Sequence, residues 1–373
     1  MTKTTISPLT APTSFVIFGA TGDLAQRKLL PALFNLFTAG YLPKTFRIIG
    51  VARDHLSTAE WRRFVEGIIT AAGQQISAEK LTEFLTTLTY QEGLFEDGQS
   101  YLRLSEELIR IENKEFGKCS NKLFYLAVSP LYYSTIFTNL AHSGLTIPCG
   151  GDDGWTRILV EKPFGRDLDT AQELDRTLGL LFKEEQIFRI DHYLAKETLQ
   201  NILAFRFSNS LFEPLWNSTY IDKVEIKVWE ELGVGTRGAF YEDVGALRDV
   251  GQNHMLQMLA LIAMEDPGVV TAAAIRRARA KVLTALVPLG AHEVAHDTVR
   301  AQYQGYREEQ NVATLSNTET FFRIKAHITN ERWEGVPFYL ESGKKMEENL
   351  VTISIFFKER ASCLIEPNDD QRY

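Results

Sequence analysis

A cluster of polar side chains in RIDHYLAKETLQ (residues 189–200) has the composition of a phosphate-binding site. If this stretch is helical, His192 and Lys196 lie four residues apart and Tyr193 and Lys196 three apart, so the three side chains share one face. Two potentially cationic groups and a hydroxyl suit a phosphate monoester, and free N–H groups at a helix start would add donors. The residues alone also allow a solvated helix face with His192 packed beneath it.

A histidine in ALRDVGQNHMLQMLALIAMEDP (246–267) is a candidate general base. His254 borders an apolar helical stripe formed by Met255, Leu256, Leu259, Ile262 and Ala263. A lone histidine beside a core is more often structural, and no second His or Cys stands at ligand spacing from it. We therefore predict no metal site, and this stretch alone leaves the role of His254 open.

These side chains need elements that position them, and the clearest is a strand, glycine turn and helix near the start of the chain. The apolar run SFVIF (14–18) predicts a buried strand, GATGDL (19–24) a turn, and residues 23–38 a helix. Gly19 and Gly22 would let the backbone approach a pyrophosphate at the helix N-terminus. A tight turn that needs glycine only for its φ angle is the alternative.

A complete G-x-G-x-x-G match, GVGTRG (233–238), is predicted not to bind a dinucleotide. The preceding segment KVEIKVWEE (223–231) alternates apolar and charged residues, which is typical of an antiparallel strand with one solvated face. No clean apolar strand follows at the spacing of a βαβ unit. We therefore predict a flexible loop between a strand and a helix.

The end of the second buried strand predicts the coenzyme. FRIIGVA (46–52) is followed by Arg53 and Asp54. NAD-binding folds place an acid at this position for the ribose 2′-hydroxyl, whereas a guanidinium suits a 2′-phosphate. Arg53 therefore predicts NADP, with NAD possible because of Asp54, although an exposed strand-end charge is the commoner fate of an arginine.

The first half of the chain alternates strands and helices. Further strand patterns at 122–128 and 156–163 follow helical patterns at 59–72 and 100–113. This order predicts an α/β domain, a Rossmann-like doubly wound parallel sheet.

Composition narrows the class of protein. The 373 residues suggest about two domains, and a net charge of −8 gives no broad basic surface for nucleic acid or a membrane. No apolar run spans a bilayer and the first ten residues are polar, so we expect a cytoplasmic protein. Cys119, Cys149 and Cys363 are far apart and odd in number, which predicts a reducing compartment without a disulfide or zinc pattern.

Several stretches together carry a family resemblance. GATGDLAQRKLLPALFNL, GVAR, EKPFG, RIDHYLAKE, RDVGQNH and NERWEGVPFYLESGK stand in the order and rough spacing found in glucose 6-phosphate dehydrogenases. The chain resembles that family from about residue 14 to 358. The stretches RIDHYL-x-K and EKPFG are more specific than any glycine motif.

The resemblance implies roles for individual residues. His254 would be the general base and Asp191 the carboxylate that orients it, while His192, Tyr193 and Lys196 would hold the 6-phosphate. The residues implied at the sugar hydroxyls are Lys162, Glu230, Asp249 and Lys344. Those implied at the coenzyme are Gly19, Thr21, Gly22, Asp23, Leu24, Arg53 and Lys162. The implied reaction oxidises D-glucose 6-phosphate at C1 to 6-phospho-D-glucono-1,5-lactone with hydride transfer to NADP, and it enters the oxidative pentose phosphate pathway without a metal.

The resemblance also implies the domain layout. We expect an NADP-binding domain over residues 1–187 and a substrate-binding and dimerisation domain over 188–373, with a large, mostly antiparallel sheet and helices on one face. Family members continue well beyond the strand LVTISIFFKER (350–360), which implies a C-terminally truncated second domain and a weakened homodimer. The alternatives are a truncated relative that binds NADP or sugar phosphate without turnover, and an enzyme for another aldose phosphate.

Overall fold

The computed structural model of the protein describes residues 11–71, 77–149 and 154–359. The chain divides into two compact units, Met1–Ile190 and Asp191–Tyr373. Each unit has its own sheet and its own hydrophobic core, so each is described by itself.

The first unit is built on a six-stranded parallel sheet with the order β3-β2-β1-β4-β5-β6. Its strands are β1 (Thr13–Phe18), β2 (Phe46–Ala52), β3 (Leu88–Glu92), β4 (Asn121–Leu126), β5 (Thr156–Val160) and β6 (Ile187–Arg189). The strand β1 pairs with β2 on one side and β4 on the other, so the order reverses beside β1. A reversal of this kind opens a crevice for ligands at the carboxyl ends of the strands.

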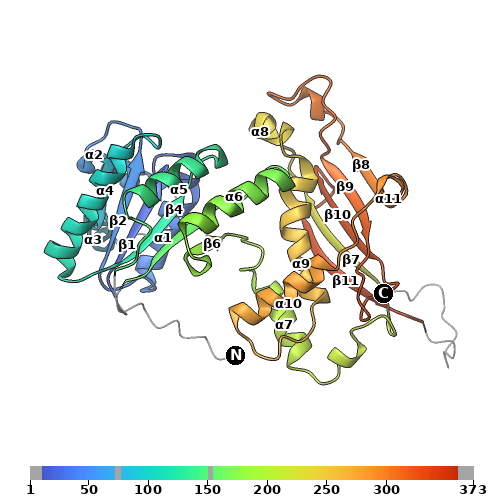
Figure 1. Ribbon diagram of the computed structural model, residues 1–373. Coiled ribbons are helices and arrows are strands. Elements are labelled where there is room, and N and C mark those ends of the chain that lie inside the picture. The colour runs from blue at the N-terminus through green and yellow to red at the C-terminus, as the bar shows by residue number, and fades with distance from the viewer. Residues whose placement is uncertain (1–10, 72–76, 150–153, 360–373) are drawn as a thin grey trace. The chain divides into compact units, whose positions relative to one another are not determined.

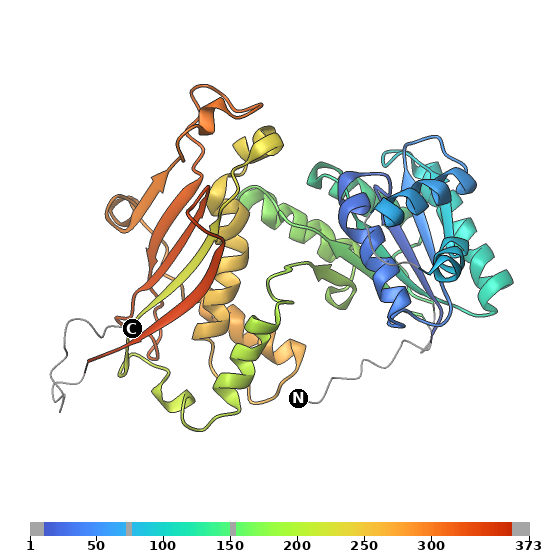
Figure 2. The same ribbon diagram turned by 180° about the vertical axis from the view of Figure 1, so that it is seen from behind.

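Helices cover both faces of this sheet, as Figures 1 and 2 show. One core joins the sheet to α1 (Leu30–Thr38), α2 (Thr58–Ala71) and α3 (Ala78–Thr86), and the other joins it to α4 (Gly98–Ile111), α5 (Tyr133–His142) and α6 (Leu168–Leu181). Burial on both faces is the reason that β1 and β2 read as continuous apolar runs. The prediction of a doubly wound sheet is confirmed.

The second unit contains a five-stranded sheet with the order β11-β7-β10-β9-β8. Its strands are β7 (Ile221–Glu230), β8 (Thr298–Ala301), β9 (Phe321–Ala326), β10 (Phe338–Lys344) and β11 (Leu350–Phe357). Among these pairs only β7 and β10 are parallel, so the sheet is mostly antiparallel, as predicted. In β7, Val224, Ile226 and Val228 are buried and the residues between them are not, which confirms the predicted alternation.

The helices of the second unit are α7 (Glu197–Phe207), α8 (Gly238–Glu242), α9 (Leu256–Ala263), α10 (Ala272–Thr284) and α11 (Ala291–Asp297). Helices α7, α9 and α10 supply the core that covers the apolar face of the sheet (Figure 1). Helix α9 is apolar apart from Gln257, and its residues from Met258 to Ala263 are buried, which confirms that the predicted apolar stripe faces the core.

The prediction about the cysteines is wrong for one pair. Cys119 and Cys149 form a disulfide, although they lie 30 residues apart in the sequence. Cys119 precedes β4 and Cys149 precedes β5, and because these strands are parallel neighbours, the segments that enter them meet at one edge. Glu112 lies close enough to form a three-ligand cluster with these cysteines, but the sulfurs are bonded to each other and Lys122 donates to Glu112. Cys363 lies outside the described residues.

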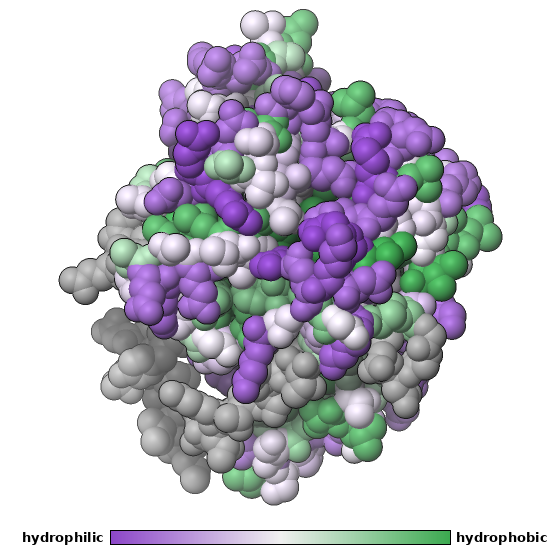
Figure 3. All heavy atoms as spheres, turned by 90° about the vertical axis from the view of Figure 1, so that its left-hand side faces the viewer, coloured by the Kyte–Doolittle hydropathy of each residue, from purple (hydrophilic) through white to green (hydrophobic). Residues whose placement is uncertain are grey.

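None of the helices in the described ranges is long and apolar enough to cross a membrane. In the face shown in Figure 3, hydrophilic residues predominate and hydrophobic ones are interspersed among them. The polar first ten residues and the segment after residue 359, on which sequence predictions were made, lie outside the described part of the chain.

Candidate active site

The predicted coenzyme turn leaves β1 at Gly19, whose backbone has a φ of +78°. A Cβ atom at Gly19 would lie 2.4 Å from the carbonyl oxygen of Ala127 at the end of β4. The N–H of Gly19 donates to Val51 O at 2.8 Å and that of Gly22 to Gly19 O at 2.9 Å. Glycine is therefore needed here both for its φ angle and for close backbone approach, and the turn sits beside the reversal of strand order.

Side chains link this turn to the end of β2. The Thr21 hydroxyl donates to Asp54 Oδ2 at 2.5 Å, and Gln26 Nε2 donates to the Thr21 carbonyl at 2.6 Å. Asp23 and Leu24 begin the helical segment, which continues through a π-helical turn, Ala25–Leu29, into α1. Asp23 is exposed and pairs with Arg27 at 2.7 Å.

Arg53 follows the last residue of β2 and is exposed. No ion pair joins its guanidinium to any other residue that the structure describes, so its charge is available to a phosphate. Asp54 is held by Thr21 and is adjacent, which is the arrangement from which the sequence predicted NADP with NAD possible.

Lys162 follows β5 and is half-buried. Its neighbour Glu161 is held by the Tyr125 hydroxyl, and the Glu161 carbonyl accepts from the Tyr133 hydroxyl at 3.0 Å. Because β1, β2 and β5 are parallel, the structure brings Lys162 to the same sheet edge as Gly19 and Arg53.

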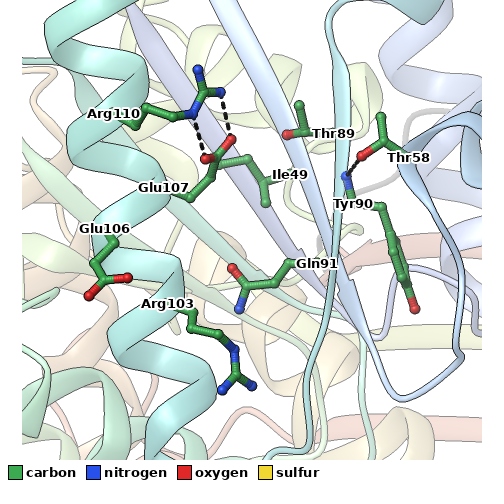
Figure 4. A pocket seen from close by; sticks show the side chains of 9 residues that line it. All are labelled: Ile49, Thr58, Thr89, Tyr90, Gln91, Arg103, Glu106, Glu107 and Arg110. Carbon is green, nitrogen blue, oxygen red and sulfur yellow. Dashed lines mark hydrogen bonds and ion pairs between the residues drawn. The ribbon is translucent and has the colours of Figure 1, made fainter.

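A separate pocket of the first unit lies between β2, β3 and α4 (Figure 4). Its charges are largely paired: Arg110 donates to Glu107 at 2.7 and 2.8 Å, and Figure 4 shows these bonds beside Thr89. None of the residues predicted to bind the coenzyme lines this pocket. It is therefore distinct from the predicted coenzyme turn.

The GVGTRG stretch belongs to the second unit and follows β7. Val234 is buried there, and its N–H donates to the Tyr303 hydroxyl at 3.1 Å. A Cβ atom at Gly238 would lie 2.1 Å from Gln310 O, so this glycine is needed for close packing. The stretch leads into α8, and the parallel partner of β7, the strand β10, follows only after β8 and β9. The stretch is therefore not the turn of a βαβ unit, as predicted.

The second unit brings His254 and Asp191 together. The His254 Nδ1 atom lies 2.7 Å from Asp191 Oδ1, and their side chains are only 3% and 15% exposed. His254 sits on a π-helical segment, Leu247–Met255, while Asp191 precedes a turn and also accepts the N–H of Tyr193 at 3.0 Å. Because an ionised carboxylate can only accept, this geometry places the imidazole proton on Nδ1 and leaves Nε2 as an acceptor.

The pKa of Asp191 is below its usual range. Burial opposes ionisation, but the hydrogen bond from His254, its charge and the Tyr193 N–H together outweigh it. The carboxylate therefore stays ionised at neutral pH, as an orienting group for an imidazole must.

The predicted phosphate residues gather around the same histidine. The Tyr193 ring stacks on His254 with centroids 4.3 Å apart, and the His192 ring lies 4.6 Å from His254. Lys196 Nζ lies 3.6 Å from the centre of the Tyr193 ring. The three predicted side chains and the candidate base therefore share one cluster.

The helical spacing used to predict this cluster is wrong. Residues 192–195 form a turn, and α7 begins only at Glu197. Successive bonds from Ala195 N to His192 O and from Lys196 N to Tyr193 O, at 3.3 and 3.0 Å, close this turn. A series of i to i+3 bonds also places residues three and four apart on one side, so the prediction of proximity was right for another reason.

Glu230, Asp249 and Lys344 form a second polar group in this unit. Glu230 ends β7 and Lys344 ends β10, and the two residues are direct partners in the parallel register. Lys344 Nζ pairs with Glu230 and lies 3.9 Å from Asp249 Oδ2. The lysine side chain is 5% exposed and that of Glu230 is 42% exposed, so the carboxylate reaches solvent while the ammonium is buried.

Sequence reasoning missed Tyr241, which lies beside this group. The Lys344 Nζ atom is 5.3 Å from the centre of the Tyr241 ring. Burial, then the charges of Asp249, Glu319 and Glu230, raise the pKa of the Tyr241 hydroxyl, which has no hydrogen-bond partner among the described residues. The tyrosine follows GVGTRG in the short helix α8, and no periodic pattern in the sequence singles it out.

A doubly wound sheet with a glycine turn, followed by a domain with a buried His–Asp pair and a cationic cluster, is the make-up of a nicotinamide-dependent oxidoreductase. The sequence matches the family described as "Glucose-6-phosphate dehydrogenase, NAD binding domain" over residues 16–201 and "Glucose-6-phosphate dehydrogenase, C-terminal domain" over 203–372. The chain belongs to the glucose-6-phosphate dehydrogenase family, so the resemblance is confirmed. The first match also confirms a nicotinamide coenzyme.

Individual relatives agree with this result. The chain is 42% identical to "Glucose-6-phosphate 1-dehydrogenase" of Treponema pallidum, over 98% of this chain and 73% of that protein, and 44% identical to that of Rhizobium meliloti, over 93% and 71%. A solved "Glucose-6-phosphate dehydrogenase in complex with its substrate glucose-6-phosphate" is similar with a TM-score of 0.87 and 35% identity, covering 96% of this chain and 74% of that chain. The enzyme from Mycobacterium avium is similar with a TM-score of 0.84 and 34% identity, covering 95% and 75%.

Proposed function

We propose that this enzyme oxidises D-glucose 6-phosphate at C1 to 6-phospho-D-glucono-1,5-lactone with NADP as the hydride acceptor. In this proposal the first domain, residues 1–187, binds NADP and the second, residues 188–373, binds the sugar phosphate. The observation that carries it is the buried His254–Asp191 pair, 2.7 Å apart, beside the three side chains that we propose bind the phosphate. The relatives' names and the substrate complex of the similar structure support the choice of substrate.

His254 and Asp191 handle the proton of the reaction. Loss of hydride from C1 requires loss of the proton from the C1 hydroxyl, and His254 accepts it on Nε2, the nitrogen that Asp191 leaves without a proton. The imidazolium that forms is stabilised by the ionised Asp191, which does not itself take the proton. When bound, NADP supplies the hydride-accepting nicotinamide.

The phosphate and the sugar hydroxyls have separate partners. Lys196, His192 and Tyr193 bind the 6-phosphate, because an ammonium, an imidazole and a hydroxyl can all donate to its oxygens. Glu230, Asp249 and Lys344, together with Lys162 from the first domain, bind sugar hydroxyls. The pairing of Lys344 with Glu230 and Asp249 holds these groups in place before substrate arrives.

Gly19, Thr21, Gly22, Asp23, Leu24, Arg53 and Lys162 form the proposed coenzyme site. The residues fit a dinucleotide, because the turn at Gly19 has no room for a Cβ atom and lies where the strand order reverses. The exposed Arg53, with no ion-pair partner among the described residues, favours the 2′-phosphate of NADP over NAD.

The proposal also includes a homodimer and a place in the oxidative pentose phosphate pathway. The second unit covers one face of its sheet with helices, and the other face carries Trp229, Tyr339 and Phe356 among charged residues. Aromatic side chains of this kind are enriched at interfaces. Sedimentation equilibrium tests the proposed homodimer, which should have twice the mass of the chain. The cytoplasmic location stays a prediction.

A spectrophotometric assay tests the function. Glucose 6-phosphate with NADP should produce reduced coenzyme. With unphosphorylated glucose at the same concentration the rate of coenzyme reduction should be low, because glucose lacks the phosphate contacts. Equal rates with both sugars would contradict the proposal that His192, Tyr193 and Lys196 bind the phosphate. Binding of both ligands without turnover would favour the alternative of a non-catalytic relative.

A further inference from the structure

The segment Ala291–Asp297 carries two histidines on one helix that the proposed reaction does not use. Its sequence, HEVAH over 292–296, has the pattern H-E-x-x-H, in which the histidines at i and i+4 lie on one face and can chelate one metal ion. The segment is helical in the structure, as α11, and it contacts β8 and β9 at one end of the five-stranded sheet (Figure 1). The prediction of no metal site rested on the surroundings of His254 and did not consider this motif.

The two imidazoles have the spacing of a chelate. The ring centroids of His292 and His296 are 4.4 Å apart. With a metal–nitrogen distance of about 2.1 Å, each ring centre lies about 3.2 Å from the ion, so ligands about 90° to 110° apart have centroids about 4.5 to 5.2 Å apart, and the observed separation is close to the lower value. Both side chains are exposed, so their rotamers can adjust toward one ion.

A neighbouring carboxylate leaves one nitrogen of His292 for the metal. Glu293 Oε1 lies 3.7 Å from His292 Nδ1, and the side chains of His292 and Glu293 are 79% and 45% exposed. Metal-binding histidines commonly keep a carboxylate at the ring nitrogen that does not bind, which orients the ring. With Nδ1 near the carboxylate, Nε2 is the nitrogen of His292 that is available to a metal.

We propose that His292 and His296 bind one divalent transition metal ion of the class that prefers imidazole, such as Zn²⁺, Ni²⁺ or Cu²⁺. No third His, Cys, Asp or Glu converges on the pair among the residues the structure describes, so the remaining coordination positions are open to water. Hydrolysis of the H-E-x-x-H type is not proposed, because that chemistry needs a third protein ligand and a site shielded from solvent. The site is one of metal binding, on the surface and independent of the dehydrogenase reaction.

Isothermal titration of the full chain with Ni²⁺ tests the site. We expect one Ni²⁺ per chain in the wild type, and His292→Ala and His296→Ala should each weaken binding by about 10²-fold or more, because a chelate loses its second, intramolecular contact. His55→Ala is the matched control, since His55 is another exposed histidine, at 95% exposure, and its loss should leave the titration unchanged.

Loss of Ni²⁺ binding in a variant can be distinguished from loss of the fold, and the titration does not depend on the proposed dehydrogenase reaction. Thermal unfolding without metal should be the same in all variants, because both histidines are exposed. The readout does not use enzyme activity, so it stands whether or not the proposed reaction is right. Wild-type Ni²⁺ affinity in either single variant, or no measurable binding by the wild type, overturns the proposal.

Discussion

Replacing Asp191 by Asn removes the charge that faces His254 and little else. The Asp191 Oδ1 atom accepts both the His254 Nδ1–H, at 2.7 Å, and the Tyr193 N–H, at 3.0 Å. An asparagine can keep its oxygen at this position, so the turn and both hydrogen bonds can survive. The variant therefore measures what the negative charge contributes to stabilising the imidazolium.

The magnitude follows from the burial of the pair. A hydrogen bond to a charged group contributes about 1.5 to 3 kcal/mol, and at about 1.36 kcal/mol per tenfold this is about a 10- to 150-fold loss of turnover. The side chains are 3% and 15% exposed, so solvent screens the interaction little and the upper half of this range is expected. If the amide instead donates to Nδ1, the proton moves to Nε2 and the loss is larger still.

His254→Ala should lower turnover by about 10²- to 10⁴-fold, the usual contribution of a positioned proton acceptor. Asp191 acts through the imidazole, so the double variant should be no slower than His254→Ala alone. The assay is the initial rate of coenzyme reduction at saturating glucose 6-phosphate and NADP. Coenzyme binding, measured separately, should be unchanged in all three variants.

Asp222→Asn is the matched control, because Asp222 is an exposed aspartate at the start of β7. Its turnover should equal that of the wild type. Wild-type turnover in Asp191→Asn, or a double variant in which the two losses multiply, would falsify the assignment of Asp191 as the group that acts through His254.

Three further predictions concern the phosphate, the coenzyme and the fold. Lys196→Gln should lower kcat/KM for glucose 6-phosphate by about 10- to 150-fold through lost charged hydrogen bonds, with little effect on the weak rate with glucose; equal losses on both sugars would contradict the phosphate role. Arg53→Ala should weaken the binding of NADP by about 1.5 to 3 kcal/mol and that of NAD much less. If titrations with each coenzyme give the wild-type ratio of NADP affinity to NAD affinity, Arg53 lies outside the site. Burial opposes ionisation of Glu112, but hydrogen bonds from Lys122 and Ser120 outweigh it and lower the pKa of this carboxyl group. Ionised Glu112 therefore stabilises the fold at pH values above the ordinary carboxyl pKa, and this stabilisation is lost as the pH falls through the lower pKa of the folded state. Glu112→Gln should therefore destabilise the fold at neutral pH by about 3 kcal/mol and flatten the acid side of the stability curve, and unfolding at a series of pH values would expose the error if the two curves stay parallel.

Local patterns were enough to predict the central strands of the first unit. The strands β1 and β2 are short, largely buried apolar runs, and glycines mark the turn at Gly19, so residues close in the sequence carry the information. The strands β3 (LTYQE) and β6 (IFR) have no such apolar run and were not predicted. In the stretch 189–200, treated as helical, the helix begins only at Glu197, and residues three and four apart in the preceding segment come together through consecutive turns. The periodicity of side chains does not distinguish these two backbones over so short a stretch.

Contacts between distant residues could not be predicted from periodicity. His254 and Asp191 are 63 residues apart, and Lys344 and Glu230 are 114 apart, so only the family resemblance pointed to them as parts of one site. The disulfide between Cys119 and Cys149 depends on the adjacency of β4 and β5. That adjacency is known only when the order of the strands in the sheet is known. The metal motif was visible in the sequence, and its significance needed the helix that presents it.

The parallel pairing of β7 and β10 has a consequence for how the chain tolerates change. Parallel neighbours cannot be joined by a hairpin, so the sheet requires a long excursion between Glu230 and Lys344. That excursion contains Asp249 and His254 near its start and α11 much later. The spacing of the acid and the lysine is set by backbone register, so insertions in the later part of the excursion should leave it intact. An insertion directly after α10 would lengthen the chain between β7 and β10 without moving either strand, and His254, the proposed proton acceptor, would keep its place after β7.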